Sequence, residues 1–180
     1  MLIMGVALVP VPVMLFPILK KRKEALSLGY VVFRVLEGVT YIATIMSMLL
    51  LLTLSQEYVK AGAPDASYFQ TLGTLLLEAG VWVDYVRFIV FSLSALILNY
   101  VLYQLKLIPR WLSVFGLLGG TLHLVAGLLG MFGLLTSISP MVTFLAFHAC
   151  IMIQEMVFAV WLIVKGFNSS AIAAQSTKQI

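Results

Sequence analysis

Four ionisable side chains lie inside the long apolar segments of this chain: Arg34, Glu37, His123 and Glu155. Such groups are costly in hydrocarbon, so they face the interior of a helical bundle and pair with one another. At about 1.5 Å per helical residue, counted from the nearest cationic boundary, all four lie roughly 15–20 Å deep. Arg34 and Glu37 are three residues apart and share one helix face. We therefore expect one polar layer contributed by three helices.

The sequence leaves two uses of this layer open. In the first, the layer is a proton or substrate site in which Arg34 binds an anion or a carboxylate. In the second, Arg34 bridges Glu37 and Glu155 as a structural clamp that locks the bundle. Because Arg34 and Glu155 lie at almost equal depth on separate helices, we expect their coupling to be tighter than that of Arg34 with Glu37.

The two histidines, His123 and His148, suggest further chemistry. His148 and Glu155 are seven residues apart, two turns along one helix face, and such a pair could begin a proton relay. Their separation of roughly 10 Å along the axis is too large for two ligands of one metal ion. His123 and His148 lie on different predicted helices and could instead be the axial ligands of a b-type haem. Hydrogen bonding in the core is the expected use of His148 and of Glu155 taken alone. We expect no metal and no cofactor.

Small residues form a ridge around His123 on the same predicted helix. They would let a flat ring approach, but close packing of helices through small residues explains them more simply. The ridge consists of Gly116, Gly119, Gly120, Gly127 and Gly130.

Asp84 and Arg87 form a second pair at i, i+3 spacing, near the outer end of a predicted span. The long side chain of Arg87 can extend to the membrane interface. We therefore expect a surface ion pair at this position.

The composition describes a membrane protein. Apolar residues make up 62% of the 180 residues and charged residues 10%, against about 25% charged in ordinary soluble domains. The mean hydropathy is +1.10. The single cysteine, Cys150, excludes an internal disulfide and any multi-cysteine metal site. No HExxH, Walker, GxGxxG or GxSxG motif occurs, so we expect no enzymatic activity.

The apolar runs predict an all-α, polytopic bundle, because a spanning helix needs about 20 mostly apolar residues. We expect five spans, over residues 2–19, 26–54, 83–105, 111–136 and 141–164. Residues 69–79 should form an interfacial or re-entrant helix that leads into the third span, with one long helix as the alternative. Residues 169–180 should be a flexible cytoplasmic tail.

The distribution of cations predicts the orientation. Eight lie on one side of the predicted spans: Lys20, Lys21, Arg22, Lys23, Lys106, Arg110, Lys165 and Lys178. The opposite side has only Lys60. Because cytoplasmic loops carry the excess of Lys and Arg, the amino terminus should face out and the carboxyl terminus should face the cytoplasm.

Three stretches carry a resemblance to a known bacterial family: LFPILKKRKEALSLGYVVFRVLEG (15–38), LIPRWLSVFGLLGG (107–120) and QEMVFAVWLIVKGFN (154–168). Together they resemble the integral-membrane family called domain of unknown function 4386, which has no assigned biochemical activity. The positions that match the family pattern are Arg34, Glu37, Pro109, Arg110, Trp111, Glu155, Trp161, Lys165 and Gly166. His123 and His148 lie outside that pattern.

The resemblance implies about six spans, with an additional helix before residues 2–19. This first predicted span is short and contains Pro10, Pro12 and Pro17. We therefore expect either a longer native reading frame or a partner, such as a second copy or another membrane helix, that covers it.

Together these features predict a non-enzymatic, multi-pass protein of the bacterial cytoplasmic membrane. The expected role is to bind or conduct a small solute or proton through the Arg/Glu layer. The alternatives are a structural or accessory subunit of a membrane complex and a haem-binding electron carrier. The expected partner is the lipid bilayer, with no nucleic acid.

Overall fold

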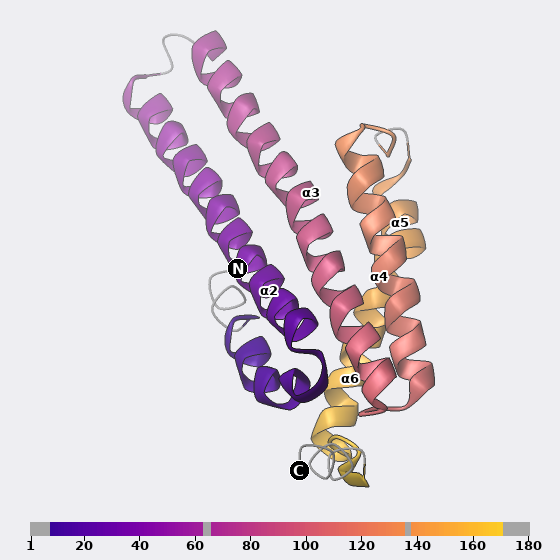
Figure 1. Ribbon diagram of the computed structural model, residues 1–180. Coiled ribbons are helices and arrows are strands. Elements are labelled where there is room, and N and C mark those ends of the chain that lie inside the picture. Colours follow the sequence, from indigo (N-terminus) through magenta and orange to yellow (C-terminus); the bar gives the residue numbers. More distant parts are fainter. Residues whose placement is uncertain (1–7, 63–65, 136–137, 171–180) are drawn as a thin grey trace.

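The computed structural model describes residues 8–62, 66–135 and 138–170, and the regular elements in these ranges are all helical (Figure 1). They are α2 (Pro10–Lys60), α3 (Ala66–Leu105), α4 (Arg110–Met131), α5 (Pro140–Thr143), the π-helical turn η1 (Phe144–His148) and α6 (Ala149–Val164). Four stretches are long and apolar enough to cross a membrane: Lys23–Lys60, Ser67–Leu105, Arg110–Met131 and Met141–Val164. The predicted all-α fold is confirmed. The predicted tail covers residues 169–180, and its part from residue 171 onward lies outside the described residues.

The structure differs from the prediction at the first span. Lys23, within α2, has the non-helical angles φ −141° and ψ 59°, and the ribbon reverses its direction there (Figure 1). The part before this reversal, Pro10–Lys20, is an apolar helix that is too short to be a spanning candidate. At 1.5 Å per residue it is about 16 Å long, roughly half the hydrocarbon thickness. The first seven residues of the chain lie outside the described part.

α3 begins earlier than the sequence suggested. It runs without interruption over 40 residues, so residues 69–79 are its first turns rather than a separate interfacial helix. The structure therefore has the alternative of one long helix. The physical reason is that α3 contains no proline, and isolated glycines such as Gly73 and Gly80 cost only about 1 kcal/mol each in a helix. α2 and α3 pack as an antiparallel hairpin that extends beyond α4 (Figure 1).

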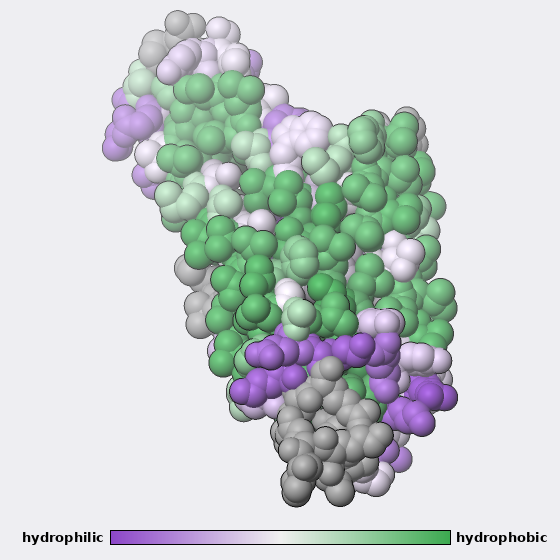
Figure 2. All heavy atoms as spheres, in the orientation of Figure 1, coloured by the Kyte–Doolittle hydropathy of each residue, from purple (hydrophilic) through white to green (hydrophobic). Residues whose placement is uncertain are grey.

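The buried apolar core lies at the end of the bundle that contains the α3–α4 connection. Its members are Leu15, Leu19, Tyr30, Leu98, Val101, Leu102, Leu105, Leu107, Ile108 and Leu112. The backbone N–H of Asn168 donates to the carbonyl of Leu107 at 2.9 Å, which ties the segment after α6 to this connection. Figure 2 shows a band of hydrophilic residues at the same end, below an apolar middle region.

Close helix packing positions the functional side chains. α4 packs between α3 and α6. A Cβ atom at Gly119 would lie 2.9 Å from the backbone N of Ile151, so only glycine permits this approach of α4 to α6. The glycine ridge therefore packs against other helices, in agreement with the simpler explanation of its composition.

Candidate functional site

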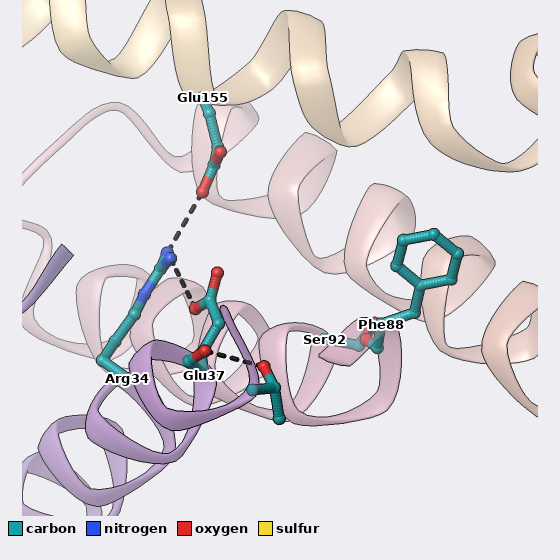
Figure 3. A network of polar contacts seen from close by, with 6 residues as sticks. Arg34, Glu37, Phe88, Ser92 and Glu155 are labelled. Atoms are coloured by element: carbon teal, nitrogen blue, oxygen red, sulfur yellow. Dashed lines mark hydrogen bonds and ion pairs between the residues drawn. The ribbon is translucent and has the colours of Figure 1, made fainter. Parts of the chain in front are cut away.

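Arg34 joins two carboxylates from two helices inside the bundle (Figure 3). Its Nη1 donates to Oε2 of Glu37 on α2, and its Nη2 donates to Oε1 of Glu155 on α6; both distances are 3.1 Å. The predicted bridge between Glu37 and Glu155 is therefore present. Arg34 Nε is buried and has no hydrogen-bond partner among the described residues.

Burial distinguishes the two carboxylates. The side chain of Glu37 is 4% exposed, whereas that of Glu155 is 43% exposed. The two ion pairs have the same length. The predicted tighter coupling of Arg34 with Glu155 than with Glu37 stays a prediction, which a double-mutant cycle measures.

Asp84 and Arg87 of α3 form the predicted ion pair, with Arg87 Nη2 2.8 Å from Asp84 Oδ1. The predicted location at the surface holds for only one partner, because the side chain of Asp84 is 38% exposed whereas that of Arg87 is 12% exposed. Two residues of α2 cover it. The guanidinium of Arg87 lies 4.6 Å from the ring centre of Tyr41. The hydroxyl of Thr44 contacts both partners of the ion pair: its Oγ1 is 3.4 Å from Arg87 Nη1 and 3.2 Å from Asp84 Oδ1.

A cavity of about 220 Å³, which we call the layer cavity, brings the two charge clusters together. Its walls include all four residues of the predicted polar layer, together with Arg87 and the aromatic side chains of Tyr41, Phe88 and Phe91. The predicted layer is therefore a spatial cluster, and the second arginine belongs to it.

The two histidines contact each other directly. The Nδ1 atoms of His123 on α4 and His148 on η1 are 2.8 Å apart, which is a hydrogen-bond distance. The rings of Phe88, Phe91 and Phe144 surround them, with ring-centre distances of 5.0–6.3 Å. His148 thus pairs with His123, and His123 in turn shares the layer cavity with Glu155.

The direct contact between the histidines bears on the haem alternative. With 2.8 Å between the Nδ1 atoms, no macrocycle fits between the two rings. The glycines that could have admitted a flat ring instead meet side chains, as Gly127 meets Phe88 and Ile89 and Gly120 meets Leu96. The geometry does not support a haem held by His123 and His148. Among the described residues, no group of three His, Cys, Asp or Glu side chains could hold a metal ion.

A second cavity adjoins the layer and contains polar groups that the sequence analysis missed. It measures about 500 Å³, and Tyr30, Asn99 and Gln154 line it together with Arg34 and Glu155. Gln154 Nε2 donates to Asn99 Oδ1 at 3.2 Å, and Asn99 Nδ2 donates to the carbonyl of Ala95 at 2.9 Å. Asparagine and glutamine within apolar spans were the signal that could have found this pair, because buried amides need partners.

The described part of the chain is all-helical, with four helices that are long and apolar enough to span a membrane and with charged side chains paired within and between them. These features define a membrane-embedded helical protein. The family model described as domain of unknown function (DUF4386) matches residues 1–166. The chain belongs to this family, as its resemblance suggested. No curated protein and no solved structure matches it.

Proposed function

We propose that this protein is a non-enzymatic, multi-pass protein of the bacterial cytoplasmic membrane whose charged layer binds and conducts a proton. The observation that carries the proposal is the combined charge balance of the two clusters that meet at the layer cavity. Two guanidinium groups, of Arg34 and Arg87, face three carboxylates, of Glu37, Asp84 and Glu155. Membrane-spanning charges that are matched by partners can be purely structural, whereas an unmatched one requires neutralisation.

An excess carboxylate inside a bundle is expensive unless it takes up a proton or a cation. Glu155 is the best placed to exchange a proton, because it is the most exposed member of the Arg34 cluster and lines both cavities. The terminal nitrogens of Arg34 already contact carboxylates of the same chain. An anion as the bound solute is therefore disfavoured relative to a proton.

A structural clamp is the second candidate, and the two contacts of Arg34 favour it. They join α2 to α6, two helices that are distant in sequence. In this alternative the protein is an accessory subunit of a membrane complex, and the charges serve only to hold the bundle together. The clamp by itself does not account for the unmatched carboxylate.

The proposed orientation follows from the ends of the helices. The junctions at Lys23, at Lys106 to Arg110 and at Lys165 all lie at the same end of the four spanning candidates. The excess of cations there favours the cytoplasmic side. We therefore place the carboxyl terminus in the cytoplasm and the α2–α3 connection outside.

A flux measurement in liposomes tests this function. The full chain is reconstituted with a trapped pH-sensitive dye, and a potassium gradient with valinomycin drives proton entry. The wild type should acidify the lumen faster than protein-free liposomes do, and Glu155→Gln should remove the difference. Glu78→Gln is the matched control, because Glu78 lies on the exposed surface of α3. Equal rates for the wild type and protein-free liposomes would overturn the proposal.

A further inference from the structure

A third cavity lies on the other side of the histidine pair from the charged layer. It measures about 330 Å³, and residues of α3, α4, α5 and η1 line it. His148 belongs to its walls, together with Tyr85 and Thr143. We call it the loop-side cavity, because it is close to the connection between α4 and α5. The layer cavity includes His123 but not His148 in its walls.

The two imidazoles and Phe88 separate these cavities. Phe88 lines both of them, and its ring lies 5.0 Å from that of His123 and 5.1 Å from that of His148. In the described part of the chain, the hydrogen bond between the two Nδ1 atoms is the one that crosses this aromatic boundary. A proton that crosses here has the imidazole pair as its path.

We propose that the His148–His123 pair transfers protons between the loop-side cavity and the charged layer. This inference rests on the proposed proton-binding function of the layer and adds a route to it. Imidazole is suited to the task because an unperturbed ring changes its protonation near neutral pH, and because it can take up a proton at one nitrogen and release one from the other.

The transfer balances in three steps. His148 starts with its proton on Nδ1, donated to the bare Nδ1 of His123, and it accepts a proton from cavity water at Nε2. The Nδ1 proton of His148 then moves to Nδ1 of His123. His123 releases its Nε2 proton into the layer cavity, where water or the Glu155 carboxylate accepts it. To reset, each ring turns away from its partner and exchanges protons with the water of its own cavity. His148 gains a proton at Nδ1 and loses one from Nε2, and His123 gains one at Nε2 and loses one from Nδ1, so the starting tautomers return with no further net transfer.

The surroundings of the two imidazoles favour proton transfer through them over a permanently protonated ring. The neighbours from α3 and η1 are the uncharged rings of Phe88, Phe91 and Phe144. The charged and titratable groups that share a cavity with His123 are Arg34, Glu37, Tyr41, Arg87 and Glu155. The backbone at His148 is also unusual, because residues Phe144–His148 form a π-helical turn. Such turns are frequent at functional sites.

The inference is tested with the liposome assay on His123→Gln and His148→Gln. Each should reduce proton entry to the rate of protein-free liposomes. Glu78→Gln is again the control, because it removes a titratable group from the exposed surface of α3 that lines neither cavity, and it should conduct like the wild type. If both histidine variants conduct like the wild type while Glu155→Gln does not, the inference is wrong and the proposed function stands. If the wild type does not conduct, both are wrong.

A spectroscopic measurement on the wild type guards against misfolded variants. The chain has two histidines, so nitrogen NMR of protein labelled at histidine reports on this pair alone. We expect one ring protonated at Nδ1 and the other at Nε2, with the Nδ1 proton exchanging between the rings. Two rings that are both protonated at Nε2 have no shared proton, and that result would overturn the inference regardless of the flux data.

Discussion

Removing the charge of Arg34 should destabilise the protein strongly. Arg34→Met leaves Glu37, with a side chain only 4% exposed, without its ion-pair partner. Breaking a buried ion pair by deleting one partner typically costs about 3–5 kcal/mol. Glu155→Gln alone should cost less than Arg34→Met, because Arg34 keeps its contact with Glu37 and no charge of this cluster is left without a partner.

The free energy of unfolding in detergent measures this cost. The triple variant Arg34→Met, Glu37→Gln, Glu155→Gln should recover much of the loss, because none of the three positions then carries an unmatched charge. Arg110→Met is the matched control: Arg110 is exposed at the start of α4, so its loss should change stability by about 1 kcal/mol or less. The reasoning would be refuted if Arg34→Met were as stable as Arg110→Met, or if the triple variant recovered nothing.

Three further predictions concern the bundle around the layer. Arg87→Met should lower the free energy of unfolding by about 1–3 kcal/mol, through loss of its ion pair and of its contact with Tyr41; an unchanged denaturation midpoint would contradict its burial. Gly119→Val should cost about 1–3 kcal/mol in the same assay, since the added side chain meets the backbone of α6; wild-type stability would show that α4 and α6 are farther apart. In a variant without Cys150, a membrane-impermeant thiol reagent applied to whole cells should label a cysteine at position 62 and not one at position 170; the reverse pattern would invert the proposed orientation.

Contacts that depend on spacing within one helix, or on depth, could be predicted from the sequence. The i, i+3 spacing alone predicted the pair of Arg34 and Glu37. The common depth of Arg34 and Glu155 predicted their contact between α2 and α6. In both ion pairs the nitrogen and oxygen atoms are 3.1 Å apart. Depth does not determine how far each helix is rotated about its axis. For this reason the contact between His123 and His148 could not be derived, although both residues were identified.

Features that depend on neighbouring helices were missed. Arg87 was expected at the interface because a lone helix offers its side chain no other partner, yet Tyr41 of α2 covers it. Residues 69–79 were expected to form a separate interfacial helix, but α3, which packs along α2, is one continuous helix through them. In each case tertiary contacts decided the outcome.

Infrared difference spectroscopy of the wild type against Glu155→Gln tests the central claim most directly, because a protonated carboxylic acid has a carbonyl stretch that a carboxylate lacks. The network has one more carboxylate than it has guanidinium groups, and Glu155→Gln removes that excess. We predict the band of a protonated carboxylic acid in the wild type at neutral pH, its loss in Glu155→Gln and its retention in Glu78→Gln. Identical spectra for the wild type and Glu155→Gln would contradict a proton held by the charged layer.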